Sequence, residues 1–261
     1  MTKFLHTADW QIGRLYGSFD PDDAVTLADA RFAAIERLAR LAAEERVDAV
    51  LVAGDVFDAQ TVSARTIRRL FNALEPYPGP WVMIPGNHDA ALAEGVWSYA
   101  KRLDALPANL HLALEPQVFE LPEQRIVVLC APLTQRHTYG DLTDWFDARE
   151  TPLGWLRVGV SHGAVQGLLS EDIDSANPIA PDRAQRARLD YLALGDWHGT
   201  KRIRSHLVQR HAGARSLQGQ RLRAGAPGGD RSAGRAAASP RRRIAIAARW
   251  RGGWRCTSDR P

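Results

Sequence analysis

Short apolar runs alternate with amphipathic stretches through the first 203 residues, and this alternation predicts an α/β fold. The apolar runs, which we expect to be buried strands, cover residues 3–9, 48–55, 81–89, 125–132, 155–163 and 189–199. Apolar positions recur at helical spacing in residues 24–46 and 62–74, which predicts a helix after each of the first two strands. Continuous apolar strands joined through helices indicate a covered sheet that is parallel in at least its first half. Residues 164–188 are polar and irregular, and we expect a loop with a short helix there.

The charge of the chain changes sharply after Arg204. Residues 1–204 hold 21 Lys and Arg against 28 Asp and Glu, whereas residues 205–261 hold 13 Arg against 2 Asp. The net charge of +4 therefore comes entirely from the C-terminal part, and bulk attraction to a phosphate backbone is not the main binding force of the acidic body. We divide the chain into a folded domain, residues 1–203, and an Arg/Ala/Gly-rich tail, residues 204–261.

Other features of the composition point to a cytoplasmic protein. Cys130 and Cys256 give no disulfide framework and fit a reducing compartment. No apolar run is long enough to span a membrane, and the N-terminus lacks the apolar stretch of a signal peptide. We therefore expect no membrane association.

Residues with oxygen or imidazole groups follow five of the predicted strands. They are Asp9, Asp55, Asn87, His88, His162, Asp196 and His198. A single Asp or Asn at a strand end ordinarily caps a helix or shapes a turn, and a lone His is more often a hydrogen-bonded core or surface residue. Strand ends of an α/β sheet form its ligand crevice, however, and ligand-type residues at five such ends together indicate a metal site.

The same segments carry five ordered motifs, namely TADWQ, GDVFD, GNHD, SHG and GDWHG. Together they resemble the calcineurin-like metallophosphoesterases. The opening FLHTADWQIGR and the motif spacing most resemble the DNA-repair exonuclease branch, whose members are SbcD-like nuclease subunits. The resemblance covers residues 1 to 203. It implies an α/β fold in which a β-sandwich of two mixed sheets is flanked by helices, here incomplete at the C-terminus.

This resemblance implies two divalent metal ions, which supply positive charge and an activated water for phosphodiester hydrolysis. The implied metal ligands are Asp9, Gln11, Asp55, Asn87, His162, Asp196 and His198, with Asp55 bridging the two ions. His88 and Asp89 are the implied catalytic residues. His88 would protonate or stabilise the leaving oxygen, and Asp89 would orient His88. Mixed oxygen and imidazole ligands suit Mn²⁺, with Mg²⁺ or Fe²⁺ as alternatives.

Two positions depart from the family pattern. Gln11 stands where the family has histidine, and Asp196 stands for the first histidine of G-H-x-H. A neutral amide is a poorer ligand than imidazole, so we expect weaker binding of the first metal, while Asp196 favours harder cations. We expect the neighbouring Trp10 and Trp197 to pack in the fold, with base stacking as the alternative.

The tail has three interpretations: a disordered nucleic-acid-binding arm, a low-complexity linker, or the product of a shifted reading frame. Codons can be chosen for residues 206–218, HLVQRHAGARSLQ, so that the same nucleotides read one base later encode TWYSGTPEPDRF. That string resembles the YSG(S/T)P segment that follows G-H-x-H in the family. We therefore favour a frameshift, which would remove the last sheet strands and the substrate-capping region.

Three functions stay open on the sequence alone. The favoured one is a metal-dependent DNA exonuclease or endonuclease of DNA repair, which pairs with an SbcC-like coiled-coil ATPase and can form a homodimer. The second is a phosphodiesterase that acts on small nucleotides. The third is a catalytically impaired, truncated remnant, which the changes at Gln11 and Asp196 and the unusual tail support.

Overall fold

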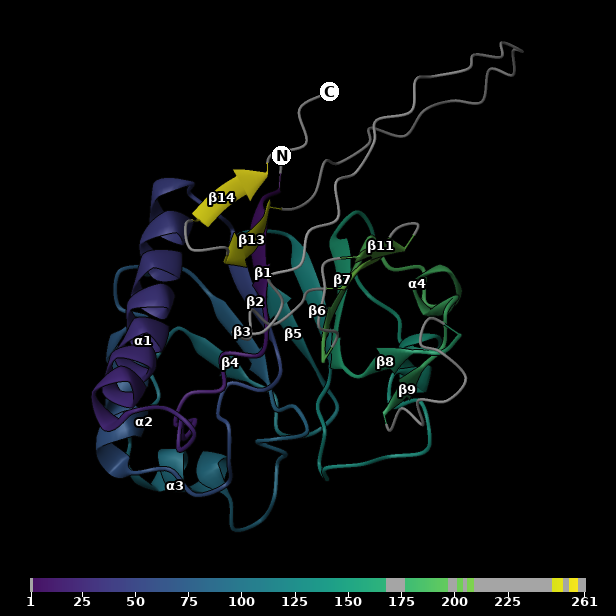
Figure 1. The fold of residues 1–261 in the computed structure, drawn as a ribbon. Coiled ribbons are helices and arrows are strands. Elements are labelled where there is room, and N and C mark those ends of the chain that lie inside the picture. The colour runs from purple at the N-terminus through teal and green to yellow at the C-terminus, as the bar shows by residue number, and fades with distance from the viewer. Residues whose placement is uncertain are drawn as a thin grey trace, which may run out of the picture.

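The computed structural model describes residues 2–167 and 177–196, together with the backbone of four strands at residues 201–203, 206–208, 246–250 and 254–257. Two six-stranded sheets pack face to face between layers of helices (Figure 1). This architecture confirms the predicted α/β fold with two mixed sheets. None of the described helices is long and apolar enough to cross a membrane.

The first sheet carries the N-terminal half of the chain. Its strand order is β14 (Trp254–Thr257), β13 (Ile246–Trp250), β1 (Phe4–Thr7), β2 (Ala49–Ala53), β3 (Trp81–Ile84) and β4 (Leu110–Leu112). All neighbours are parallel except β13 and β14. The parallel register aligns the carboxyl ends of β1, β2 and β3 at one edge of the sheet.

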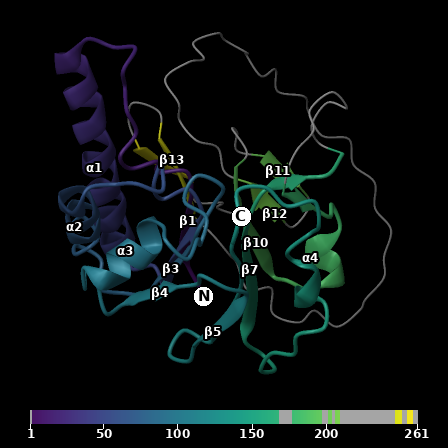
Figure 2. The same cartoon turned by 90° about the horizontal axis from the view of Figure 1, so that it is seen from below.

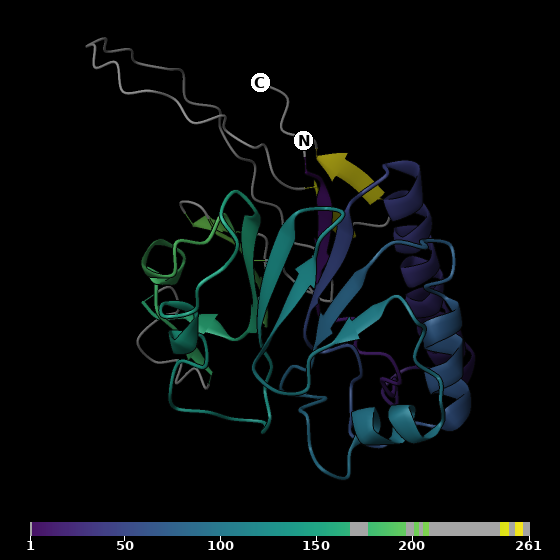
Figure 3. The same cartoon turned by 180° about the vertical axis from the view of Figure 1, so that it is seen from behind.

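The second sheet has the order β11 (Lys201–Ile203), β12 (His206–Val208), β10 (Tyr191–Gly195), β7 (Leu156–His162), β6 (Ile126–Ala131) and β5 (Gln117–Leu121). Its central strands are parallel, and β5 and β11 are antiparallel to their neighbours. A separate parallel pair joins β8 (Ala164–Val165) and β9 (Pro178–Ile179). The view from behind shows the strands of both sheets side by side between the helices (Figure 3).

Helices cover the outer faces of the two sheets. The first sheet carries α1 (Pro21–Glu44), α2 (Ala64–Asn72) and α3 (Val96–Arg102), and the second carries α4 (Arg183–Arg186) and a 3₁₀ turn at Asp144–Phe146. The same layers are seen from below in Figure 2. Helix α1 begins at a capping aspartate, because the Asp20 carboxylate accepts from the Asp22 N–H (3.1 Å), and Pro21 takes the first helical position. Ser63 caps α2 in the same way through the Thr66 N–H.

The alternation of side chains along each strand divides the core into three clusters. Val50, Val52 and Met83 face the helices α1 to α3, whereas Leu51, Ala53 and Val82 face the second sheet. A third cluster lies between the outer face of the second sheet and α4. Both faces of each central strand are therefore buried, which explains the continuous apolar runs in the sequence. A buried hydrogen bond also joins the sheets, because His6 Nδ1 lies 2.9 Å from the Tyr191 hydroxyl.

The boundaries differ from the predicted ones in three places. Strand β3 ends at Ile84, so GNHD lies in a loop beyond the strand rather than in it. Helix α3 and the edge strands β4 and β5 have weak periodicity and were not expected. Residues 164–188 hold β8 and β9 besides the expected short helix. Strands β12 to β14 come from residues assigned to the tail, and the division at residues 203 and 204 stays a prediction.

Candidate metal centre

The polar motif residues converge at the carboxyl ends of five strands from both sheets. Asp9, Asp55 and Asn87 follow β1, β2 and β3 of the first sheet. The second sheet supplies His162, which is the last residue of β7, and Asp196, which directly follows β10. Because His162 is paired with Gly195 in the register of β7 and β10, His162 and Asp196 reach the same level of the sheet.

Asp9, Asp55 and His162 form the closest group of potential ligands. All three are buried, and one ligand atom of each lies within 4.8 Å of the others. The Nε2 atom of His162 lies 3.6 Å from Asp55 Oδ1 and 3.8 Å from Asp196 Oδ1. Its Nδ1 lies 2.8 Å from the Ala53 carbonyl oxygen, to which it donates. This bond fixes the ring and directs the Nε2 lone pair of the neutral tautomer toward the carboxylates, as in a metal-binding histidine.

Asn87 places one terminal atom of its amide among the same groups. That atom lies 3.1 Å from His162 Nε2 and 3.0 and 3.1 Å from the two oxygens of Asp55. An amide NH₂ at this position donates to the surrounding acceptors. If the amide oxygen of Asn87 lies there instead, it faces only other acceptors, and a cation is needed among them to offset their repulsion. The site therefore suits either a proton donor or a metal ion.

The charges of the site are unbalanced in the protein alone. Oδ2 of Asp9 is buried and has no hydrogen-bond partner among the described residues. Burial raises the pKa of Asp9 well above its usual range, and the charges of Asp55 and Asp196 add to this shift. For His162, burial alone would lower the pKa, but Asp55, Asp9 and Asp196 outweigh it and raise the pKa to about 9. Several carboxylates around one imidazole, with an orphaned oxygen among them, fit a divalent cation.

His88 lies at the rim of this group and is partly exposed. Its backbone N–H donates to Asp55 Oδ1 at 2.9 Å, and its ring Nε2 lies 4.0 Å from Asp55 Oδ2. The ring Nδ1 lies 3.0 Å from the carbonyl oxygen of Asp58 and 3.9 Å from Asp58 Oδ1. Asp58, and not Asp89, therefore contacts the His88 ring.

The hydrogen bonds of Asp89 go to backbone groups of two loops. Its buried carboxylate accepts the backbone N–H groups of Val56 (2.9 Å), Phe57 (3.1 Å) and Gly86 (2.7 Å). Asp89 thus ties the loop after β2 to the loop after β3 and positions Asp55 and Asn87. Burial, with the charge of Asp55, raises its pKa to about 7.

Gln11 also lies close to the centre, but its side-chain oxygen is already bonded. Oε1 accepts a hydrogen bond from Arg14 Nη1 at 2.7 Å, and the Gln11 backbone N–H donates to the Asp55 carbonyl oxygen at 2.9 Å. Arg14 was not singled out in the sequence analysis. Its spacing of three residues from Gln11 in the QIGR segment was the available signal.

The backbone at the ligand positions is strained. Asp9 (φ 55°), Gln11 (45°), Asp55 (53°) and Asp196 (75°) all adopt positive φ, which non-glycine residues rarely do. Close packing adds to this constraint, because a Cβ at Gly86 would lie 2.2 Å from Asp55 Oδ1 and a Cβ at Gly195 would lie 2.0 Å from the Ala53 carbonyl oxygen. Four of the nine non-glycine residues that have positive φ among the described residues therefore lie at this site.

Residues 2–199 match the family model of the calcineurin-like phosphoesterases. The chain belongs to this family.

Among the relatives of this phosphoesterase is the D subunit of the SbcCD nuclease from Rhodobacter capsulatus, which is 39% identical over 96 residues, or 34% of this chain and 22% of the relative. The uncharacterized metallophosphoesterase YhaO of Bacillus subtilis is 27% identical over 205 residues, or 75% of this chain and 48% of the relative. The chain thus spans less than half the length of these curated relatives. The crystal structure of TT1561 of Thermus thermophilus aligns at a TM-score of 0.49 and 11% identity, covering 79% of this chain and 87% of that chain.

Three further residues singled out in the sequence are His198, Trp197 and Trp10. His198 and Trp197 lie outside the described residues, so the ligand role of His198 stays a prediction. Trp10 is buried, donates from Nε1 to Thr7 Oγ1 at 2.9 Å and packs edge-on against Trp81. Its packing role is the one expected.

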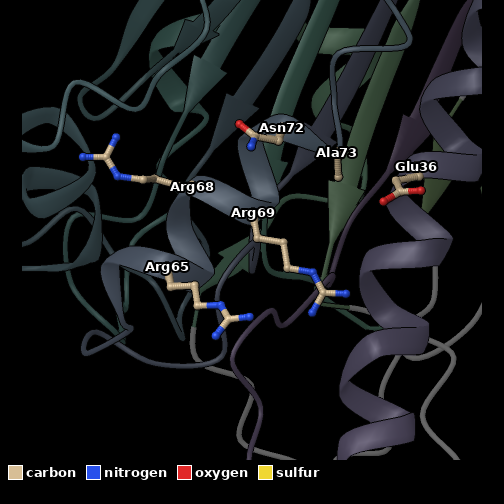
Figure 4. A pocket seen from close by; sticks show the side chains of 6 residues that line it. All are labelled: Glu36, Arg65, Arg68, Arg69, Asn72 and Ala73. Carbon is tan, nitrogen blue, oxygen red and sulfur yellow. The ribbon is translucent and has the colours of Figure 1, made fainter.

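A hollow of about 580 Å³ lies between α1 and α2, on the outer side of the first sheet (Figure 4). It is lined by Glu36, Arg65, Arg68, Arg69, Asn72 and Ala73. Arg69 is paired with Asp29 at 2.6 Å and stacks on Phe32, whereas Arg65 and Arg68 have no ion pair among the described residues. In Figure 4 the Arg68 side chain points away from Arg65 and Arg69.

Proposed function

We propose that this calcineurin-like phosphoesterase is a metal-dependent nuclease that hydrolyses phosphodiester bonds of DNA. The observation that carries the proposal is the buried group of Asp9, Asp55 and His162, with Asn87 and His88 beside it at one edge of the sandwich. The match to the nuclease subunit from Rhodobacter capsulatus supports DNA as the substrate.

The proposed ligands of two divalent ions are Asp9, Asp55, Asn87, His162, Asp196 and His198. Asp55 is the natural shared ligand because its two oxygens face Asn87, His88 and His162. Bound divalent ions neutralise the phosphate charge and lower the pKa of a water molecule, and the oxygen-rich ligand set favours Mn²⁺, with Mg²⁺ or Fe²⁺ as alternatives.

His88 is the proposed proton donor to the leaving oxygen. Its Nδ1–H is directed at the Asp58 carbonyl oxygen, so Nε2 is the atom that faces the centre and the substrate. A positioned acid of this kind contributes a factor of roughly 10²–10⁴ to the rate. Asp89 supports this arrangement through the two loops rather than through the His88 ring.

By the same relationship we propose an SbcC-like coiled-coil ATPase as the partner. From the family resemblance we propose a homodimer as the assembly. A phosphodiesterase on small nucleotides is the alternative, and the acidic charge of residues 1–204 favours it, because long nucleic acids are attracted by extended basic surfaces.

The deciding experiment compares three substrates with the full chain in Mn²⁺: linear duplex DNA, single-stranded DNA and bis(p-nitrophenyl) phosphate. A nuclease degrades labelled DNA, and Asp55→Asn loses activity on all three substrates. A small-molecule phosphodiesterase cleaves only the nitrophenyl ester, and an impaired remnant cleaves none.

The His88→Asn variant tests the role of the proton donor. Its kcat should fall by about 10²–10⁴ on DNA, where the leaving alkoxide needs a proton, and much less on the nitrophenyl ester, where it does not. An equal loss on both substrates contradicts the assignment of His88 as the acid.

A further inference from the structure

Gln11 and Arg14 form a pair in the segment that follows β1 and Asp9. The amide oxygen of Gln11 accepts from Arg14 Nη1 at 2.7 Å, and the Arg14 backbone N–H donates to the Gln11 carbonyl oxygen at 3.3 Å. Gln11 itself is almost fully buried (5% exposed), and its N–H is bonded to the carbonyl of Asp55. The pair is therefore fixed to the residue proposed to bridge the two metal ions.

The hydrogen bond from Arg14 changes what the Gln11 side chain can do. An amide oxygen that accepts from a guanidinium already interacts with a group that carries a delocalised positive charge. A divalent ion on the same oxygen would place two cations a few ångströms apart on one neutral ligand, which is electrostatically unfavourable. The geometry thus opposes Gln11 as a metal ligand, although this position is a ligand in the family pattern.

The Arg14 guanidinium is well suited to bind an anion. Its side chain is exposed, it keeps its charge at any physiological pH, and Gln11 uses only one of its five N–H donors. Among the described residues its other donors have no protein partner. Two adjacent N–H groups match two oxygens of a phosphate, and such charge-assisted bonds are about twice as strong as neutral ones.

The negative charge of the metal centre is a reason for a cation such as Arg14 to contact the substrate. The carboxylates of Asp9, Asp55 and Asp196 face the same centre, and a phosphodiester that approaches it meets this negative charge. An arginine beside the site offsets part of that repulsion without competing for the metal ligands.

We propose that Gln11 is a positioning residue which holds Arg14, and that Arg14 binds the non-bridging oxygens of the phosphate at the metal centre. The chain thereby replaces a metal-binding imidazole with a phosphate-binding guanidinium. This inference rests on the proposed phosphodiesterase function and names a substrate contact of the same site.

The test measures two affinities by titration calorimetry on the full chain: Mn²⁺ alone, and inorganic phosphate on the Mn²⁺-loaded protein. Arg14→Ala and Gln11→Ala should leave the Mn²⁺ dissociation constant within about threefold. Both should weaken phosphate binding, and Arg14→Ala by about 10- to 100-fold, because a hydrogen bond between charged groups is lost. Arg14→Lys keeps the charge without the planar fork and should recover part of the affinity.

Arg68→Ala is the matched control, because Arg68 is an exposed arginine without an ion pair among the described residues, on helix α2. It should change neither affinity. Gln11→His tests the exchange in the other direction. Restoring the imidazole should tighten Mn²⁺ binding and, since it removes the oxygen that holds Arg14, weaken phosphate binding.

Two results would overturn the inference. If Gln11→Ala and Arg14→Ala both weaken Mn²⁺ binding tenfold or more, Gln11 is a metal ligand that Arg14 merely supports. If Arg14→Ala leaves phosphate affinity unchanged, Arg14 only shapes its loop. The phosphate titration decides this even when wild-type protein cleaves no DNA, so failure of the proposed nuclease function is seen separately.

Discussion

Two carboxylate-rich clusters in this protein differ in how much positive charge the protein places beside them. Around Arg183, whose side chain is fully buried, Asp141 and Asp147 each lie 2.8 Å from a guanidinium nitrogen, and Asp144 contacts the same group. Arg186 adds a second cation, 2.8 Å from Asp147. At the metal centre, the carboxylates of Asp9, Asp55 and Asp196 surround the buried imidazole of His162, and the partly exposed ring of His88 lies 4.0 Å from Asp55. The first cluster contains its own counter-charge, and the second does not.

This difference in counter-charge shifts the pKa values of Asp141, in the Arg183 cluster, and of Asp9, at the metal centre, in opposite directions. Burial alone would raise the pKa of Asp141, but hydrogen bonds from Thr143, Ala180 and Arg183 outweigh it and lower the pKa. For Asp9 burial prevails, and the pKa rises. A buried acidic cluster that is internally compensated holds the fold together, whereas one that lacks a cation is built to receive it from outside.

The largest expected effect concerns the compensated cluster. Arg183→Met leaves Asp141 and Asp147 without their buried partner and should lower the free energy of unfolding by about 3–5 kcal/mol. Arg186→Met is the control, since Arg186 is half exposed and its pair with Asp147 should contribute at most about 1 kcal/mol. Urea denaturation measures both. Equal losses would mean that burial does not distinguish the two arginines.

The next effect concerns the uncompensated cluster. Mn²⁺ at 100 times its dissociation constant should stabilise the wild-type protein by about 2.7 kcal/mol, and chelation should remove this increment. Asp9→Asn should abolish the increment and yet leave the metal-free protein at least as stable as wild type, because it removes the charge of a buried carboxylate whose Oδ2 has no hydrogen-bond partner among the described residues. Thermal denaturation with and without metal tests this, and a marked loss of metal-free stability in Asp9→Asn would show that the charge is compensated after all.

The smallest effect is on pH dependence. The pKa of Asp141 is lower in the folded protein than in the unfolded chain, so the ionised group stabilises the fold above its ordinary pKa of about 3.9. This contribution is lost as the pH falls through the lowered folded value. Asp141→Asn should therefore be less stable than wild type at pH 6, and the difference should shrink toward pH 2. A difference that is constant with pH would assign the effect to packing and not to charge.

The sequence predicted the α/β fold, because apolar runs and helical spacing are local patterns, and it predicted that polar residues follow several of the strands. Apolar runs marked β1, β2, β6, β7 and β10, and the parallel register places whatever follows them at one edge. Asp9 and Asp55 are brought together by the pairing of β1 and β2 within the first sheet, whereas His162 belongs to the second sheet and was grouped with them by the family motifs. Helix α3 and the edge strands β4 and β5 were not predicted, because short, half-exposed elements have no sustained hydrophobic periodicity.

Side-chain directions could not be predicted in the same way. Nothing in GNHD indicates that Asp89 turns toward backbone N–H groups of another loop, or that Asp58 takes its place beside His88. The Arg183 cluster joins residues that are 36 to 42 positions apart in the sequence, so no local motif predicts it. These contacts depend on how distant segments meet, and only the folded chain defines them.

The spread of the metal ligands along the chain has a consequence for how the protein folds. The Asp196 N–H reaches Asp9 across 187 positions (3.4 Å), and His162 reaches the Ala53 carbonyl across 109. Contacts of such long range form late, since the loops that they close must first lose their entropy. Neither half of the sandwich supplies all of the proposed ligands, so a metal ion gains its full ligand set only when the two halves have met. Its capture should be among the last steps, and a chain that holds the ion is one in which both sheets have already met.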